Sequence, residues 1–458
     1  MPVRKHLYTT PRQRSLSRGA IAMACLGLAL CGFMSNAAWA VPVIQHWQTS
    51  NGVRVLFVEA HELPMVDIQV VFDAGSARDG DTPGVANLTS DLLNEGAGDL
   101  SADQIADRFE GVGAQFSASA DRDSATVSLR SLSDPDLLQP AMETLTQVLQ
   151  SPSFPKHAFM RERKRMLVAL QQEQESPGDI ANNKFYAVLY GKHPYAGDPL
   201  GTADALNKLS RDDVAAFHHR YYVADNALLV IVGDLDKTGA QKLADALMDK
   251  LPRGKRPAPL PRAEDMDKSE TVMVPHPSTQ THVLSGQVGI TRKDPEYFAL
   301  YVGNHVLGGN GLVSRLAEEI REKRGLSYST YSYFLPLAAR GPFIIGLQTR
   351  NTEVKQAIDV MNQTLRNYIA DGPTAEELKE AKQNITGGFP LRIDSNRKIA
   401  NYLAFIGLYD LPLDYLNTFN DHVEQVTAAD IRSAFKQHVH PDKRLTVVVG
   451  GGADAADK

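Results

Sequence analysis

Cysteine is almost absent from this chain, and its scarcity excludes several kinds of chemistry. The 458 residues include two cysteines, Cys25 and Cys31, both within the first forty. That segment carries basic residues but no acidic ones, then an apolar run of signal-peptide length and an A-W-A sequence ending at Ala40, which is typical of a cleavage site. We therefore expect an export signal over 1–40, a periplasmic location, and a mature chain without disulfides or cysteine ligands.

Long apolar runs and an excess of basic residues are also missing. No later segment is apolar over enough residues to cross a membrane. The net charge of the full chain is −6, and loss of the five basic residues in the expected signal would lower it to −11. An acidic surface disfavours nucleic acid and anionic lipid as main partners. We expect neither a nucleic-acid partner nor a membrane span.

The familiar catalytic motifs are absent as well. The sequence contains no HExxH, HxxEH or GxSxG motif, no P-loop and no strand-linked GxGxxG. Among 13 histidines, the close pairs are His218-His219 and His438-His440. Both pairs fall near the end of a predicted helix, where cationic side chains are favoured. We interpret them as helix-end residues, with metal ligation as the alternative.

What the chain does contain is a long internal repeat. LSRDDVAAFHHRYYVADNALLVIVGD (209–234) resembles VTAADIRSAFKQHVHPDKRLTVVVGG (426–451), and the pairs Asp213/Asp430 and Gly233/Gly450 are both separated by 217 positions. Each copy predicts a helix, a turn and a buried β-branched strand closed by glycine. The likeness continues upstream, where VDIQVVFDAGSARD and THVLSGQVGITRKD each predict a strand.

The repeat predicts an α+β fold built by tandem duplication. We expect two similar α/β-sandwich domains, each an antiparallel-rich sheet packed with helices. The Pro-rich and charged stretch 251–270 has no apolar period and is the expected linker. The predicted boundaries are a signal at 1–40, domains at 41–250 and 271–452 flanking that linker, and a tail at 453–458.

One predicted helix has the spacing of a metal site but not its side chains. GVANLTSDLLNEG (84–96) has apolar residues at helical spacing, and Thr82 is its expected N-cap. On the other face, Asn87, Ser90 and Asp91 are placed to reach one metal ion. Asn and Ser oxygens are poor zinc ligands, so the residues alone leave open a solvated face or a lost metal site.

A glycine-rich segment precedes the next predicted helix. The residues Gly308, Gly309, Asn310 and Gly311 form either an inter-helix turn or a flexible stretch whose backbone N–H groups bind an extended peptide.

The following segment, RLAEEIREKRGLSYSTYSYFLPL, predicts a surface helix ended by Gly325 and then a strand. This places Arg321 late on the helix and Tyr328 just beyond the corner. Spacing alone favours a solvated charge and a half-buried strand aromatic.

The sequence REKRGLSY, the two similar halves and the VVG-type strand closing each half together resemble the insulinase or pitrilysin-like zinc peptidases. The resemblance is to the branch that includes mitochondrial processing peptidase and bacterial periplasmic two-subunit members. It implies a clamshell-forming fold, an HxxEH helix with a downstream Glu in a zinc-bearing half, and an Arg and a Tyr seven positions apart in its partner half. Arg321 and Tyr328 have that separation.

The chain departs from the family pattern at the zinc site. Where zinc-binding members read GLAHLLEHML, this chain reads GVANLTSDLL, so Asn87, Ser90 and Asp91 replace His, Glu and His. The downstream Glu aligns near Val168 or Ala169, and we assign it to Ala169. We predict no metal and no cofactor in this chain, because zinc hydrolysis needs imidazole and carboxylate ligands and a base.

Three functional hypotheses follow. In the first, the chain is one subunit of a heterodimeric peptidase whose homologous partner supplies HxxEH and zinc, with peptides or unfolded polypeptides as substrate. Arg321 and Tyr328 would then stabilise negative charge developing on the substrate carbonyl, and the peptide would pair with a sheet edge within 113–132. In the second, the chain is an inactive scaffold or peptide-binding protein, a role that relatives in the respiratory chain imply. The third is an independent hydrolase that uses Asp91 with another ion.

Overall fold

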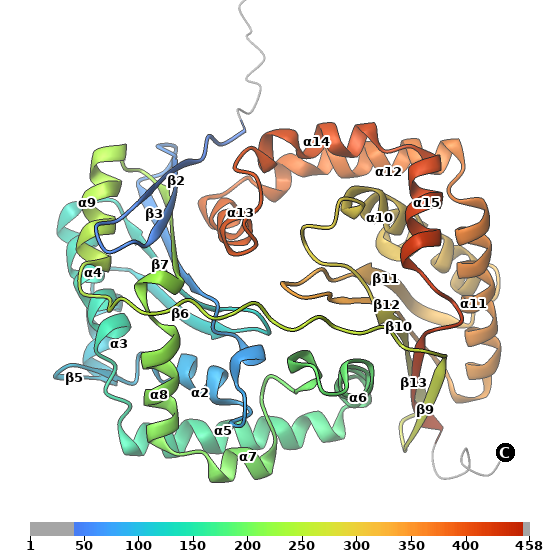
Figure 1. The fold of residues 1–458 in the computed structure, drawn as a ribbon, viewed down its shortest axis with the longest axis horizontal. Coiled ribbons are helices and arrows are strands. Elements are labelled where there is room, and N and C mark those ends of the chain that lie inside the picture. The colour runs from blue at the N-terminus through green and yellow to red at the C-terminus, as the bar shows by residue number, and fades with distance from the viewer. Residues whose placement is uncertain (1–40, 452–458) are drawn as a thin grey trace, which may run out of the picture. The chain divides into compact units, whose positions relative to one another are not determined.

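The computed structural model describes residues 41–451. The expected export signal and the expected tail at 453–458 lie outside the described residues. Within 41–451, every helix is too short or too polar to span a bilayer. The described chain forms two large mixed sheets with helices packed on them, as Figure 1 shows.

The first sheet has six strands in the order β1-β2-β8-β3-β7-β6. Strands β2 and β8 are parallel and the other neighbours are antiparallel. All seven residues of β8 are buried, which explains its unbroken apolar sequence ALLVIVG. The strands are β1 (Gln45–Gln48), β2 (Arg54–Glu59), β3 (Met65–Phe72), β6 (Gln115–Ala120), β7 (Ala125–Leu132) and β8 (Ala227–Gly233).

The second sheet repeats this topology with five strands in the order β9-β13-β10-β12-β11. Its β9 and β13 are the parallel pair, as β2 and β8 are in the first sheet. The predicted pair of glycines adopts one unusual conformation in both copies, with φ 147° at Gly233 and 149° at Gly450. The strands are β9 (Glu270–His276), β10 (Gln280–Val288), β11 (Ser327–Phe334), β12 (Pro342–Arg350) and β13 (Leu445–Gly451).

The helix before the closing strand is also duplicated. It begins with the same capping box in each half, in which Ser210 and Asp213 in one copy correspond to Thr427 and Asp430 in the other. The tandem duplication and the α+β class predicted from the sequence are therefore confirmed.

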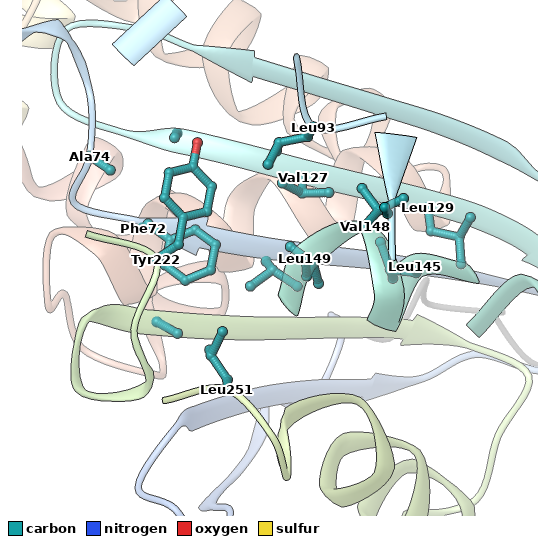
Figure 2. Packing of buried hydrophobic residues seen from close by; sticks show 14 of the residues in the cluster. Phe72, Ala74, Leu93, Val127, Leu129, Leu145, Val148, Leu149, Tyr222 and Leu251 are labelled. Atoms are coloured by element: carbon teal, nitrogen blue, oxygen red, sulfur yellow. The ribbon is translucent and has the colours of Figure 1, made fainter. Parts of the chain in front are cut away.

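Helices of the first half bury their apolar faces on the first sheet. Figure 2 shows Leu145, Val148 and Leu149 of α4 among the buried side chains that include Val127 and Leu129 of β7. The helices are α2 (Val85–Leu92), α3 (Ala102–Glu110), α4 (Pro135–Gln150), α5 (Lys156–Glu175), α7 (Ala203–Lys208), α8 (Arg211–Tyr221) and α9 (Lys237–Met248), and a two-stranded ribbon joins β4 (Gly96–Ala97) to β5 (Leu100–Ser101).

The second half contributes a similar set of helices to its own core. These are α10 (Tyr297–Asn304), α11 (Val354–Asp371), α12 (Ala375–Gly388), α14 (Tyr415–Gln425) and α15 (Ala428–His438).

Two helices cross from one half to the sheet of the other. Helix α6 (Pro177–Tyr190) belongs to the first half but packs on β10 and β13, and α13 (Asn396–Leu408) of the second half packs on β8 and β3 (Figure 1). Glycine at each contact allows the helix and the strand to approach closely. A Cβ atom on Gly286 of β10 would lie 2.8 Å from the Phe185 ring, and one on Gly407 of α13 would lie 2.4 Å from a Leu228 methyl.

Candidate functional site

The helix that carries the expected zinc positions is capped by a residue well upstream. Helix α2 begins after Gly84, whose φ of 92° is left-handed and which has no capping side chain. The Asp79 carboxylate instead accepts hydrogen bonds from the Gly84 N–H at 2.7 Å and the Ala86 N–H at 3.0 Å. The prediction of a Thr82 cap is therefore wrong, because the Thr82 hydroxyl donates to the Asp79 carbonyl at 2.8 Å.

Asp79 is buried, at 8% exposed. Burial raises its pKa to about 7, although the two backbone N–H groups act in the opposite direction. The start of α2 is thus held by a carboxyl group that titrates near neutral pH.

Two of the three positions on α2 are engaged in structural contacts. The Asn87 amide donates to the Pro199 carbonyl at 2.7 Å. Ser90 is 2% exposed, and its hydroxyl lies 3.3 Å from the hydroxyl of the buried Tyr222. Asp91 reaches solvent, yet desolvation and the nearby Glu162 carboxylate raise its pKa. The polar groups of Asn87 and Ser90 are therefore used to hold the surrounding chain.

Helix α5 supplies the remaining expected position. Ala169 lies on the helix face of buried Met166 and Glu162, whereas Val168 is 47% exposed. Because Ala169 lies on the inner face of the helix, it is favoured over Val168 as the position that corresponds to the family's downstream Glu. Its methyl group offers no ligand atom.

Glu162 is a buried carboxylate that the sequence analysis missed. It is 2% exposed, and its oxygens pair with Arg161 Nε at 2.9 Å and Arg165 Nη1 at 2.5 Å. The run RERKR could have indicated these ion pairs, because a single acidic residue among four basic ones on a helix is expected to pair with them. Its two arginine partners hold this carboxylate in a structural role.

A catalytic zinc ion does not fit this donor set. Asn87 and Ser90 offer neutral oxygens, Ala169 offers none, and one carboxylate at Asp91 is too few for zinc. Across residues 41–451, the grouping of side chains with metal-like spacing is elsewhere, at Asp294, Glu296 and His438.

The histidine pairs have two different surroundings. His218 is buried, its Nε2 lies 3.1 Å from the Leu149 carbonyl, and its pKa is lowered to about 4 by burial. It is therefore a neutral core residue, and the prediction of a cation favoured at the helix end is wrong for His218. His438 instead contacts a Glu296 oxygen through Nε2 at 2.5 Å.

Arg321 and Tyr328 lie together at the corner between a π-helical turn, η6 (Ala317–Glu322), and β11. The guanidinium carbon of Arg321 is 4.8 Å from the centre of the Tyr328 ring, which is cation–π geometry. Tyr328 is 81% exposed, so the half-buried aromatic that spacing favoured is not what the structure has.

A β-bulge explains this exposure. Ser327 and Ser329 pair with consecutive residues of β12, which leaves Tyr328 as the extra residue of β11. The Ser327 hydroxyl fixes the bulge by contacting the carbonyls of Ser329 at 2.6 Å and Gln348 at 2.7 Å. The bulge therefore turns the Tyr328 ring out of the sheet and beside Arg321.

The glycine-rich segment is helical rather than an open loop. Gly308 and Gly309 end a π-helical turn, η4 (His305–Gly309), and Gly311 starts a short 3-10 turn. The Asn310 N–H donates a hydrogen bond to the His305 carbonyl at 3.1 Å. Gly308 packs under β11, where a Cβ atom would lie 2.6 Å from a backbone nitrogen.

An apolar pair follows the glycines. Leu312 is 62% exposed and Val313 is 78% exposed. The segment thus combines a closely packed glycine at one end with two unburied apolar side chains at the other.

The expected peptide-binding stretch is a hairpin at a sheet edge. Residues 113–132 contain β6 and β7, and β6 is the last strand of the six-stranded sheet. Its side chains alternate between exposed and half-buried, which is the pattern of a strand with one solvated face. One edge of β6 has no neighbouring strand among the described residues.

Comparison with known proteins places both halves in one family. Residues 54–203 match Insulinase (Peptidase family M16), and residues 208–385 match the Peptidase M16 inactive domain. The solved structure of a peptidase M16 inactive domain from Pseudomonas fluorescens is 38% identical, with a TM-score of 0.86, and the match covers 89% of this chain and 98% of that chain.

Two further similar proteins differ in whether their names describe a peptidase. The protein of Helicobacter pylori named non-peptidase homolog YmxG is 28% identical, over 84% of this chain and 89% of that protein. The periplasmic protease PqqL of Escherichia coli shares the fold at 18% identity and a TM-score of 0.74, and the match covers 89% of this chain but 45% of that chain. From these matches and the duplicated fold, the chain belongs to the insulinase family of peptidases, family M16.

Proposed function

We propose that this chain is the non-metal-binding subunit of a two-chain zinc endopeptidase. It holds a peptide or an unfolded polypeptide and presents Arg321 and Tyr328 to the zinc site of a homologous HxxEH-bearing partner. The observation that carries the proposal is the contrast between two places in one chain. The zinc-site positions are filled by residues that do not make up a zinc ligand set, whereas Tyr328 is exposed and the half-buried Arg321 lies against its ring.

The pair suits the stabilisation of developing negative charge. In peptide hydrolysis the carbonyl oxygen becomes negative, and donors aimed at that oxygen lower the barrier. The Arg321 guanidinium is a permanent cation, and the Tyr328 hydroxyl is a donor at neutral pH. Stacking on the ring orients the guanidinium before substrate arrives, so less side-chain freedom is lost on binding.

Two surfaces of the chain fit a protein that handles peptides with a partner. The exposed Leu312 and Val313 supply apolar contact area beside the glycine segment. The open edge of β6 suits addition of an extended peptide as a further strand. A periplasmic location remains part of the proposal and rests on the amino-terminal sequence. Fractionation of cells that express the full chain tests it.

The test is peptide cleavage by the two-chain complex. The mature chain is co-expressed with an exported homologue that carries HxxEH, and hydrolysis of a quenched fluorescent peptide is followed. We expect Arg321→Ala to lower kcat about 100-fold or more, the usual effect of removing a donor to a developing oxyanion. Tyr328→Phe removes one hydroxyl and should lower kcat about tenfold.

Matched substitutions control for general damage. Arg324→Ala removes a neighbouring arginine that pairs with Glu319, and Tyr331→Phe removes a hydroxyl from the same strand. Both controls should cleave at close to the wild-type rate. If Arg321→Ala and Tyr328→Phe also cleave at that rate while the complex stays intact, the proposed roles are wrong.

A scaffold or peptide-binding protein without proteolysis is the second candidate. It is favoured by the combination of a zinc site filled with structural residues and a relative named as a non-peptidase homolog. Under this alternative, the complex with an HxxEH homologue binds the peptide but its cleavage rate equals that of the homologue alone.

A further inference from the structure

A pocket of about 590 Å³ in the second half combines guanidinium groups with aromatic rings. It lies among α10, α13 and the short turn η8 (Phe389–Arg392). Its charged and aromatic lining includes Arg292, Tyr297, Tyr301, Arg392, Tyr402 and Phe405. Neither the repeat nor the zinc-site comparison assigns a role to it.

Arg292 is held by aromatic rings. Its guanidinium carbon is 4.3 Å from the centre of the Phe405 ring and 5.5 Å from that of Tyr297. One terminal nitrogen lies 3.5 Å from the Tyr297 hydroxyl, and Nε is buried without a hydrogen-bond partner. An unpaired buried N–H on a cation is costly, and such a group is satisfied when an acceptor binds.

Arg392 stands on the other side of the tyrosines. Its Nη1 donates to the Tyr301 hydroxyl at 2.8 Å, and the Tyr297 and Tyr301 rings are stacked with centres 5.8 Å apart. Across residues 41–451, neither Arg392 nor Arg292 forms an ion pair with a carboxylate, whereas Lys398 at the same pocket pairs with Asp394 at 2.9 Å.

The pocket continues toward the glycine segment. A smaller cavity of about 320 Å³ shares Tyr297, Tyr301 and Arg392 and reaches His305 and Gly309. The His305 Nε2 is buried without a partner, and its pKa is lowered by burial and by the charge of Arg392. His305 and Arg392 therefore line the same cavity.

The other end leads toward the edge strand of the first sheet. Asn401 of α13 lines both the arginine pocket and a third hollow that includes Gln115 and Phe116 of β6. Arg397, one turn earlier on α13, donates to the Gln115 side chain at 3.3 Å. The hollow beside β6 and the arginine pocket are thus lined by the same helix, α13.

We propose that Arg292 and Arg392 bind a carboxylate of the captured peptide, so that this chain selects acidic peptides. The inference rests on the proposed peptide-binding function and names its substrate class. Aromatic walls accept the apolar part of the residue, and two guanidinium groups without counter-ions accept its charge. The carboxylate belongs either to a Glu or Asp side chain or to the C-terminus of the peptide.

The experiment measures peptide binding to the mature chain without a partner, because the whole pocket is built from this chain. Three labelled 12-residue peptides differ only in their acidic groups. One has two central Glu residues and an amidated end, one has Gln at those positions and an amidated end, and one has Gln and a free C-terminal carboxylate. A charge-assisted pair should give one acidic form about tenfold to 100-fold tighter binding in fluorescence polarisation, and less at high salt.

Substitutions assign the effect to the pocket. Arg392→Gln should abolish the preference, and Arg392→Lys should restore part of it, since lysine keeps the charge but not the planar fork. Arg366→Gln is the matched control, because Arg366 pairs with Asp442 at 2.7 Å on the surface and should leave the preference unchanged.

The outcomes separate this inference from the proposed function. If the three peptides bind equally, or if Arg392→Gln keeps the preference, the arginine pocket does not bind the carboxylate and peptide capture stands. If none of the peptides binds, both the pocket and peptide capture by this chain are refuted. Preference for the Glu peptide identifies side-chain carboxylates, and preference for the free C-terminus identifies terminal capture.

Discussion

Replacing Asp79 with asparagine should remove a pH-dependent loss of stability, so that the variant gains stability relative to the wild type as the pH rises. Asp79 is buried at the start of α2, and its pKa is about 7 in the folded chain against an ordinary value of 3.8. A raised folded pKa means that folding takes up a proton between these two values. The stability of the wild type is therefore lost as the pH rises from about 4 through 7.

The magnitude follows from the two pKa values. Unfolding frees the carboxyl group to ionise, and this lowers the free energy of unfolding by about 1.4 kcal/mol per pH unit between the two pKa values. The free energy of unfolding of the wild type is therefore lowered by about 1.5 kcal/mol at pH 5 and by about 4 kcal/mol at pH 8. Asparagine does not titrate, and its NH2 group cannot accept the backbone N–H that faces it, which lowers the stability of the variant by an amount that does not depend on pH. The stability of Asp79→Asn relative to wild type should therefore rise by about 2.5 kcal/mol between pH 5 and pH 8.

Urea unfolding of both proteins across this pH range measures that difference, because all other titrating groups are common to both. Asp236→Asn is the control, since Asp236 caps α9 through the Gly239 N–H at 2.6 Å but is exposed. This variant shows how much stability is lost when a capping carboxylate is removed at an exposed position. A flat difference for Asp79→Asn would refute the reasoning, because it would mean that Asp79 is ionised throughout.

Three further predictions concern metal, packing and acid stability. The purified mature chain should contain well under one zinc per chain, and near-stoichiometric zinc that disappears in Asp91→Ala would contradict this. Phe185→Ala removes a fully buried ring from α6 and should lower the free energy of unfolding by about 3–5 kcal/mol; a loss below 1 kcal/mol in denaturant titration would be inconsistent with the observed packing. Partial burial tends to raise the pKa of Glu377, but hydrogen bonds from Arg315 and Thr374 lower it to about 2. Wild type should therefore lose its stability advantage over Glu377→Gln as the pH falls from about 4.5 toward 2, and an advantage that persists at pH 2 would argue against the ion pair.

The duplication could be predicted because the same local rules act twice. Capping boxes at Ser210 and Thr427 are short-range requirements, and Gly233 and Gly450 combine a local one, a positive φ, with the close approach of a neighbouring strand. The same residues therefore recur at a fixed spacing. The prediction that this helix does not bind zinc rests on residue types within about one turn, and it stays a prediction.

Features that depend on distant contacts could not be predicted. The apolar face of α6 indicates burial but does not say which sheet covers it. The exposure of Tyr328 depends on a bulge set by its pairing with β12, and spacing alone treats it as an ordinary strand residue. The arginine pocket joins Arg292 to Arg392 across about a hundred residues, and no local pattern connects them.

The crossing of α6 and α13 makes the two halves interdependent during folding. Each sheet has one face that is finished only by a helix encoded in the other half, so a half made alone would expose apolar strand residues. A chain cut in the extended stretch near Pro257 should therefore stay together as two fragments that must be denatured to be separated.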